Sequence, residues 1–390
     1  MQKNEKTKQN KRRVMVITGT RADYGILLPV IQAIDKHPKL QLQLLATGMH
    51  LLRKFGHTID EVEQDGWPIA GRVRLQGSRD DIIGNSRAFG TAIARMTDIF
   101  HRMKTDIVLV LGDRMEMFAA AAAATAGQLI LAHIHGGDTA IGVQDEAYRH
   151  AISKLAHIHF AASAGAQKRL LMLGEESFRV YQTGSPALDN LSKKICKKIT
   201  VLNNRAGFDV RDDFLLVLQH PAGGSASQEE KRMAQTLSGC DRKGLKLLVL
   251  CPNCDSGFSG IIRAAQRVCR AKSYPFIKHL PRDVFLGLLT HARALIGNSS
   301  SGIIETGYLN VDVIDVGPRQ TGRDRGANVI DIDYGRKNVS GAVDKILQRR
   351  GKSRRKPCTI YGDGRSGIRI AAILAKIRID QKLKQKKITY

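Results

Sequence analysis

The chain has 390 residues, of which 43% are hydrophobic and 25% charged, and its formal net charge is +26. This length favours two domains of ordinary size with buried cores. No run approaches the roughly 18 uninterrupted apolar residues of a transmembrane helix, and no apolar stretch of secretory type precedes the first expected strand, so we expect a cytoplasmic protein without membrane insertion.

The positive charge is concentrated in four short segments. They are found at termini or in expected linkers, and no zinc-finger, RRM or KH motif accompanies them. We therefore interpret them as solvated segments and expect no specific nucleic-acid partner, only weak attraction to anionic surfaces at low salt. The segments are 1–13, 193–198, 345–356 and 376–387.

The six cysteines are scattered along the chain. In a protein expected to be cytosolic, reduced thiols are the default. Cys251 and Cys254 form a single CxxC pair, and a zinc site normally needs a second pair or two suitably spaced histidines. We expect no metal site.

Short β-branched or leucine-rich runs alternate with segments of helical length. The clearest helix is the alanine-rich segment 115–127, with Gly127 placed to end it. Such alternation predicts parallel sheets with helices on both faces. The expected strands are 14–18, 42–47, 107–112, 129–134, 158–163, 214–219, 245–250, 294–298, 311–316 and 328–332.

The strands fall into two series, joined by a connector at 183–198. We therefore expect an α/β fold of two Rossmann-like lobes, with an interlobe cleft suited to a nucleotide-bearing ligand. The expected division is a basic tail at 1–13, an N-terminal lobe at 14–182, a C-terminal lobe at 183–360, and a final helix with a basic tail at 361–390.

Charged residues follow two strands of the first series. The first strand ends in TGTRADYG (18–25), where Arg21 could bind a phosphate. This is not a GxGxxG motif, which disfavours a nicotinamide cofactor. The third strand ends in LGDRMEMF (111–118), where Asp113 is either a helix cap or a catalytic carboxylate and Arg114 could pair with phosphate. The alternative for Arg21 is an ordinary βα turn with a surface arginine.

The stretch 133–150, HIHGGDTAIGVQDEAYRH, is the most crowded with ionisable groups. It follows an apolar run, and open α/β sheets place ligands at the carboxyl ends of their strands. His135, Asp138, Asp145 and Arg149 are therefore candidates for acid–base chemistry. Clustered carboxylates raise at least one pKa, which provides both an acid and a base. The alternative for Asp145 and Arg149, four residues apart, is a surface ion pair on one helical face.

The second series also carries polar residues at strand ends. The segment GNSSSGIIE (297–305) is a Gly/Ser turn that opens a helix, and its hydroxyl and backbone N–H groups could hold a diphosphate. The phosphate candidates are Ser299 and Ser300, with Arg319 nearby, and Glu305 could bind the ribose. His220 and Asn253 lie at the ends of two other strands of this series.

Taken together and in this order, these motifs resemble the hydrolysing UDP-N-acetylglucosamine 2-epimerases of sialic-acid and capsule polysaccharide biosynthesis. The resemblance spans roughly residues 14 to 376. The matching segments are 18–25, 46–51, 111–118, 133–138, 145–160, 219–221, 252–257, 297–305, 319–323 and 361–364.

The resemblance implies a glycosyltransferase-B-like fold, with a last helix that crosses back to the first lobe. It implies conversion of UDP-N-acetylglucosamine and water to UDP and free N-acetylmannosamine, by anti elimination and then syn hydration, without metal or cofactor. We also expect a homo-oligomer, a dimer or a tetramer. The implied catalytic residues are Asp113 and Asp145 with Arg149, and the implied UDP contacts are Arg21, Arg114, His220, Asn253, Ser299, Ser300, Glu305 and Arg319.

Two positions depart from the family pattern. Many members have glutamate where this chain has His135, whereas a second branch of the family, seen in capsule pathways, has histidine there. Both branches usually have glutamate where this chain has Asp138. The glutamate that many members have at the position of His135 is therefore missing, and its role passes to His135 or to Asp138. The sugar could accordingly be a close relative such as UDP-N,N′-diacetylbacillosamine.

Two other functions fit parts of the sequence. A UDP-sugar-dependent glycosyltransferase would share the fold, but three clustered carboxylates are more than such an enzyme normally needs. A nucleotide- or RNA-binding protein without turnover would fit the charge, but aromatic residues make up only 5% of the chain and offer few stacking platforms.

Overall fold

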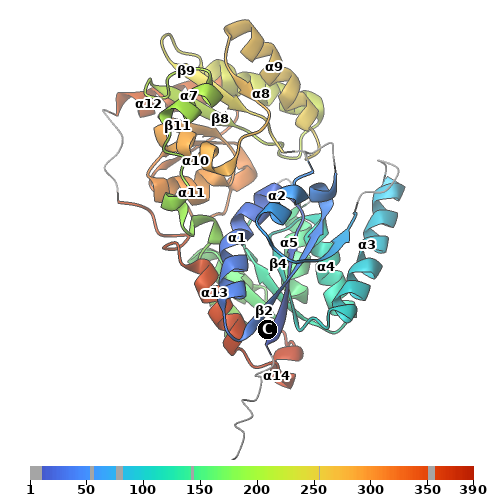
Figure 1. The fold of residues 1–390 in the computed structure, drawn as a ribbon. Helices are drawn as coiled ribbons and strands as arrows, with labels where there is room; N and C mark the ends of the chain where they lie inside the picture. The colour runs from blue at the N-terminus through green and yellow to red at the C-terminus, as the bar shows by residue number, and fades with distance from the viewer. Residues whose placement is uncertain (1–10, 53–56, 76–81, 142–144, 254, 350–355) are drawn as a thin grey trace, which may run out of the picture. The chain divides into compact units, whose positions relative to one another are not determined.

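The computed structural model describes residues 11–52, 57–75, 82–141, 145–253, 255–349 and 356–390. These residues form two compact α/β units, each built on its own parallel sheet (Figure 1). Unit 1 contains residues up to Asp138, then Ala147–Asp189 and Gly362–Tyr390. Unit 2 contains Thr139–Glu146 and Asn190–Tyr361.

The sheet of unit 1 has the strand order β3-β2-β1-β4-β5-β6-β7, and every pairing is parallel. Parallel strands need crossover connections, and the helices between them supply these. The strands are β1 Arg12–Thr18, β2 Leu40–Thr47, β3 Ile69–Val73, β4 Ile107–Leu111, β5 Ile130–Ile134, β6 Ile158–Ala161 and β7 Val180–Gln182.

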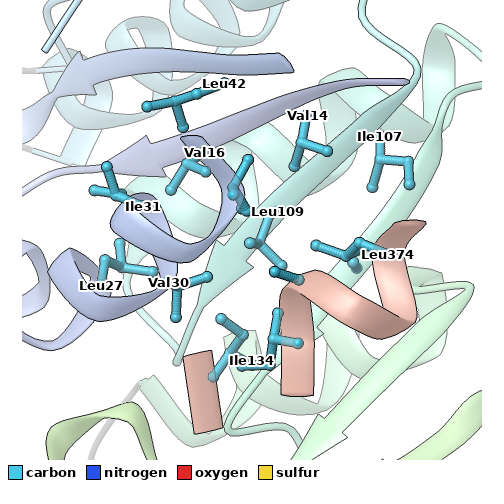
Figure 2. Close-up of a cluster of buried hydrophobic side chains, with 14 of the residues drawn as sticks. Val14, Val16, Leu27, Val30, Ile31, Leu42, Ile107, Leu109, Ile134 and Leu374 are labelled. Carbon is cyan, nitrogen blue, oxygen red and sulfur yellow. The ribbon is translucent and has the colours of Figure 1, made fainter. Parts of the chain in front are cut away.

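Alternate residues of β1 enter two different cores, because successive side chains of a strand point to opposite faces. Val14 and Val16 pack with α1 and α13 (Figure 2), whereas Met15 and Ile17 pack with α3 and α4. Both faces of the sheet are thus covered. The helices of unit 1 are α1 Arg21–Lys36, α2 Ile59–Gln64, α3 Ile82–Arg102, α4 Met115–Ala126, α5 Asp145–Leu155 (its first two residues grouped with unit 2), α6 Ala164–Met172, α13 Ser366–Lys376 and α14 Gln381–Lys384.

The sheet of unit 2 has the order β10-β9-β8-β11-β12-β13 and is also parallel. One core packs against α8, α9 and α12, and the other against α7 and α10. The strands are β8 Phe214–Leu218, β9 Lys246–Leu250, β10 Phe276–Ile277, β11 Ala294–Gly297, β12 Asp312–Val316 and β13 Val329–Ile332. The helices are α7 Ile199–Ala206, α8 Ala226–Cys240, α9 Phe258–Lys272, α10 Arg282–His291, α11 Ser301–Leu309 and α12 Arg336–Gln348.

The predicted fold class is confirmed: two α/β units, each with a parallel sheet. All ten predicted strands are present, with ends that differ by one or two residues. Three further strands, β3, β7 and β10, escaped prediction. Each lies at the edge of its sheet, and two of them have only two or three residues, too few to show a hydrophobic period. Among the helices that the structure describes, none is long and apolar enough to cross a membrane.

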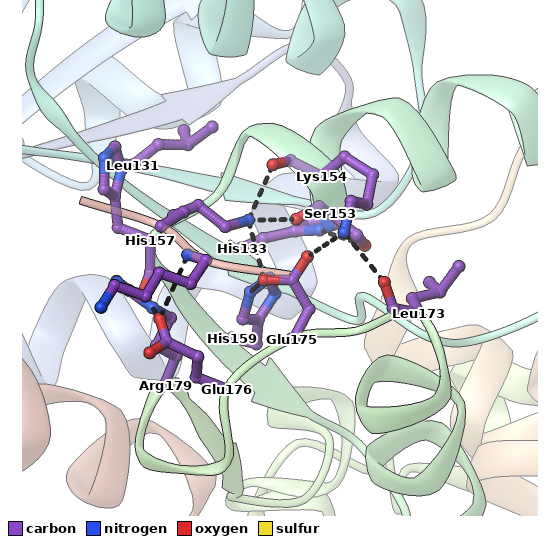
Figure 3. A network of polar contacts seen from close by, with 12 residues as sticks. Leu131, His133, Ser153, Lys154, His157, His159, Leu173, Glu175, Glu176 and Arg179 are labelled. Carbon is purple, nitrogen blue, oxygen red and sulfur yellow. Dashed lines mark hydrogen bonds and ion pairs between the residues drawn. The ribbon is translucent and has the colours of Figure 1, made fainter. Parts of the chain in front are cut away.

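The C-terminal basic segment is not a solvated tail, so that expectation was wrong for this part of the chain. Leu383 is buried in the unit 1 core, and the fully buried guanidinium of Arg179 donates hydrogen bonds to the carbonyl groups of Lys382, Leu383 and Gln385. Lys386 pairs with the buried carboxylate of Glu175 at 2.7 Å, and Figure 3 shows the polar contacts around Glu175. Of the other predicted charge clusters, residues 1–10 and 350–355 lie outside the described residues.

Helix α13 is attached to unit 1 by a carboxylate distant in sequence. Asp189 is buried, and its two oxygens accept hydrogen bonds from the backbone N–H groups of Ser366 at 2.9 Å and Gly367 at 2.6 Å. These are first-turn N–H groups that have no partner within a helix. Asp189 therefore caps a helix 177 residues further along the chain.

We expect Asp189→Ala to destabilise unit 1 by about 2 kcal/mol, because two buried N–H groups lose a charged acceptor. Urea denaturation followed by circular dichroism measures this. The control is Asp363→Ala, which removes the exposed ion pair with Arg369 on the same helix. That pair is worth at most about 1 kcal/mol. Equal losses in the two variants would contradict the capping role.

Candidate functional site

In both units, the polar residues singled out in the sequence lie at the carboxyl ends of the strands. The strand order reverses between β1 and β4 in unit 1, and between β8 and β11 in unit 2. Open α/β sheets bind ligands beside such switch points. Arg21 and Asp113 flank the first reversal, and His220 and Asn298 flank the second.

Asp113 follows β4 and forms an ion pair with Arg149 of α5. The Arg149 side chain is 3% exposed and that of Asp113 is 21% exposed, so the carboxylate can still be reached from solvent. Asp113 does not cap α4: the N-cap residue is Arg114, without a side-chain cap bond. The alternative ion pair between Asp145 and Arg149 involves the side chain of Asp145, the first residue of α5, which lies outside the described part of the chain.

His135 and Asp138 meet directly after β5. The Nδ1 atom of His135 lies 2.8 Å from Oδ2 of Asp138, and its Nε2 atom lies 2.9 Å from Oγ of Ser185. All three side chains are buried. Of the three predicted carboxylates, Asp113 and Asp138 thus each have a nitrogen partner.

The two arginines expected to bind UDP from unit 1 are held by carboxylates. Arg21 begins α1, and its Nε lies 2.9 Å from Oε2 of Glu61. Arg114 lies 3.3 Å from Oε2 of Glu116, a buried carboxylate that packs against Gly19 and would collide with a Cβ at Gly48. Both arginine side chains are about one-third exposed.

In unit 2, Asn298 links the ends of the central strands. Its amide accepts from the N–H of His220 at 2.7 Å and donates to the carbonyl of His220 at 2.9 Å. Its own carbonyl accepts from Gln320 at 2.8 Å and from Arg319 at 3.4 Å. Through its side chain the fully buried Asn298 holds the loops after β8 and β11 together, and through its backbone carbonyl group it binds the loop after β12.

The protonation state of His220 follows from its surroundings. Burial and the nearby Arg319 guanidinium lower its pKa to about 3, so the ring is neutral at physiological pH. Its Nδ1 atom accepts from the backbone N–H of Asn253 at 3.0 Å, which leaves the proton on Nε2. His220 is therefore a neutral N–H donor at the end of β8.

The remaining predicted nucleotide contacts surround the start of α11 and the end of β12. Asp255 accepts from Asn253 at 2.5 Å and lies 3.6 Å from Arg319, so it orients both. Glu305 is buried on α11, and one of its oxygens pairs with Arg282 at 2.6 Å. Ser299 and Ser300 directly precede α11, where backbone N–H groups attract anions.

The structure therefore brings together Asp113 with Arg149 and His135 with Asp138 in unit 1. In unit 2 it brings together His220, Asn253 and Arg319 through Asn298 and Asp255. Asn298 lies within a predicted motif, and its position directly after a strand was a signal that could have singled it out. Ser185, Glu116 and Arg282 carried no such signal, because each acts through a partner that only the fold supplies.

No group of three or more His, Cys, Asp or Glu side chains suited to a metal ion occurs among the residues that the structure describes. Of the predicted CxxC pair, Cys254 lies outside the described residues.

Comparisons with known proteins show the family of the chain. A family model described as UDP-N-acetylglucosamine 2-epimerase matches residues 32–375. The UDP-N,N′-diacetylbacillosamine 2-epimerase (hydrolyzing) of Legionella pneumophila is 33% identical over 96% of this chain and 98% of its own length. The UDP-N-acetylglucosamine 2-epimerase of Neisseria meningitidis serogroup B is 33% identical over 86% of this chain and 87% of its own.

Solved structures share the fold. A Neisseria meningitidis UDP-GlcNAc 2-epimerase bound to UDP-GlcNAc superimposes with a TM-score of 0.82 at 18% identity, over 94% of this chain and all of the other. The resemblance read from the motifs is thereby confirmed, as is the glycosyltransferase-B-like fold. The chain belongs to the UDP-N-acetylglucosamine 2-epimerase family.

Proposed function

We propose that this protein is a hydrolysing 2-epimerase that converts a UDP-2-acetamido sugar and water to UDP and a free 2-acetamido sugar inverted at C2. The observation that carries the proposal is the pairing of Asp113 with Arg149, next to the His135–Asp138 pair on the neighbouring strand, in a chain of this family. This arrangement supplies carboxylates for proton transfer beside a strand-order reversal.

The reaction has two balanced steps. A carboxylate removes the proton at C2 while the C1–O bond to UDP breaks, and this anti elimination leaves 2-acetamidoglucal. Water then adds syn across the double bond, so that the hydroxyl at C1 and the proton at C2 arrive on the same face. This face is opposite to the one from which the C2 proton was removed, which inverts C2. Asp113 and Asp145 are the proposed catalytic carboxylates, with Arg149 beside Asp113.

The C2 proton is weakly acidic, so the departing diphosphate must be well stabilised. In the proposal, the cations and N–H donors at both switch points perform this task, and Glu305 binds the ribose. The diphosphate and nucleotide contacts are Arg21, Arg114, His220, Asn253, Ser299, Ser300 and Arg319.

The sugar is either UDP-N-acetylglucosamine or UDP-N,N′-diacetylbacillosamine. The second is favoured by the Legionella relative, which is named for it and aligns over 96% of this chain. The first is favoured by the Neisseria relative at the same identity over a shorter length. Products of either kind are building blocks for sialic-acid-like sugars or capsule polysaccharide.

The test is incubation with each UDP-sugar in D₂O, with the products identified by NMR. We expect UDP and a free sugar carrying one deuteron at C2, because the abstracted proton exchanges with solvent before hydration. A product still linked to UDP, or no deuterium at C2, would contradict the proposal. Release of UDP only when an acceptor is added would indicate a glycosyltransferase instead.

A further inference from the structure

The turn after β5 has a backbone that few sequences tolerate. His135 has φ of 66° and Gly137 has φ of 76°, both in the left-handed region. A Cβ on Gly137 would lie 2.3 Å from the carbonyl oxygen of Ala166, so only glycine fits. The chain thus folds back, and the carboxylate of Asp138 reaches the imidazole of His135 three residues earlier.

Ser185 continues this contact into a chain of three side chains. Its Oγ atom lies 2.9 Å from Nε2 of His135 and accepts a hydrogen bond from the N–H of Ala187 at 3.3 Å. Ser185 is fully buried, and among the described residues these two groups are its hydroxyl's partners. The hydroxyl proton therefore has one acceptor available, the Nε2 atom of His135.

The alternative tautomer of His135, with the proton on Nε2, loses a hydrogen bond with each of its two partners. A proton on Nε2 would leave the buried Ser185 hydroxyl without an acceptor, and an unsatisfied buried donor is costly. It would also set the lone pair of Nδ1 against the Asp138 carboxylate, in place of a charge-assisted hydrogen bond. Both contacts favour His135 with its proton on Nδ1.

We propose that Ser185 is a positioning residue that fixes His135 as the neutral Nδ1–H tautomer, which in turn orients the Asp138 carboxylate. On this basis His135 is a hydrogen-bond donor to Asp138 and does not take the C2 proton. Asp138 then carries the negative charge of the glutamate that the family usually has. The catalytic part of this inference rests on the proposed function; the tautomer does not.

The tautomer can be measured without substrate. Histidine-selective ¹⁵N labelling and long-range ¹H–¹⁵N correlation distinguish protonated from unprotonated ring nitrogens, and the signal lost in His135→Asn identifies residue 135 among the 12 histidines. We expect a protonated Nδ1 and an unprotonated Nε2 in the wild type. Ser185→Ala should give a mixture of tautomers. A wild-type His135 that is protonated on Nε2, alone or together with Nδ1, would overturn the assignment.

Steady-state release of UDP then tests the role in turnover. Ser185→Ala should lower kcat at least about tenfold with KM nearly unchanged, because the change acts on orientation and not on binding. His135→Asn should keep more activity than His135→Gln, since the asparagine amide can donate from the position of Nδ1. The control is Ser163→Ala, another fully buried hydroxyl in unit 1, which accepts from the N–H of Ala166.

We expect the control to keep both the tautomer of His135 and its wild-type kcat. Gln matching or exceeding Asn at position 135, or a Ser185→Ala variant as active as wild type, would overturn the positioning role. If the wild type releases no UDP from any candidate sugar, the proposed function fails, while the measured tautomer still decides the hydrogen-bond assignment.

Discussion

Asp113→Asn is expected to lower kcat for UDP release by about 100-fold or more, because the amide cannot accept a proton from carbon or return one. The substitution keeps the size of the side chain and one oxygen that can accept a hydrogen bond from Arg149. It removes only the negative charge of residue 113. Stopped or continuous assays of UDP release measure kcat. Calorimetric titration with UDP should give an affinity close to that of the wild type, because the proposed nucleotide contacts do not include Asp113.

Asp106→Asn is the matched control. Asp106 directly precedes β4, whereas Asp113 follows the same strand, so the two carboxylates lie at its opposite ends. Asp106 accepts hydrogen bonds from the backbone and side chain of Arg13 and is partly exposed. Its loss should cost about 1 kcal/mol of stability at most and leave kcat unchanged. Turnover of Asp113→Asn within threefold of the wild type would remove Asp113 from the proposed mechanism.

The sequence predicted where chemistry-bearing residues lie along the strands, but not how they pair. Asp113 and His135 follow strands whose apolar runs are unmistakable, and parallel strands place such residues at one edge. The paths of the loops bring Arg149 to Asp113 and bring Ser185 to His135, 50 residues away in sequence. These paths do not follow from the pattern of the strands. A serine or arginine reads the same in a sequence whether it is exposed or buried.

The C-terminal segment shows that composition alone also fails to predict which residues are docked. Its lysines suggest a solvated tail, and the one apolar residue of α14, Leu383, is too weak a signal to indicate docking. The structure holds the segment mainly by hydrogen bonds from Arg179 to backbone carbonyl groups, which every sequence possesses. In the sequence Lys386 looks like the lysines around it, but in the structure its ammonium group meets a buried carboxylate 211 residues earlier in the chain.

That carboxylate, Glu175, is fully buried between three cationic or polar partners (Figure 3). Its oxygens lie 3.0 Å from Nε2 of His159, 3.1 Å from Nζ of Lys154 and 2.7 Å from Nζ of Lys386. Burial alone would raise the pKa of Glu175, but the hydrogen bonds from His159 and Lys386 outweigh it and lower the pKa to about 2. Burial also lowers the pKa of His159, which donates to Glu175 as a neutral ring. The ionised carboxylate therefore holds the C-terminal segment and α5 together.

We expect Glu175→Gln to destabilise unit 1 by about 3–5 kcal/mol, because it removes one member of a buried charge network and leaves the lysines facing an amide. Urea denaturation at pH 7 measures the loss. The adjacent Glu176→Gln is the control: Glu176 is partly exposed, and Arg179 keeps its carbonyl acceptors, so the loss should be about 1 kcal/mol or less. Equal losses in the two variants would contradict the network.

The same network sets a pH dependence. The folded pKa of Glu175 lies below its ordinary value of 4.5, so its contribution is complete above pH 4.5 and is lost as the pH falls towards 2. The stability difference between the wild type and Glu175→Gln should therefore stay constant from pH 7 to 5 and shrink below 4.5. Combining Glu175→Gln with Lys386→Met should cost less than the sum of the single losses, because both remove the same ion pair. The Nζ atom of Lys386 also donates to the carbonyl groups of Ser153 and Lys154, and strict additivity would show that Lys386 acts through these contacts alone.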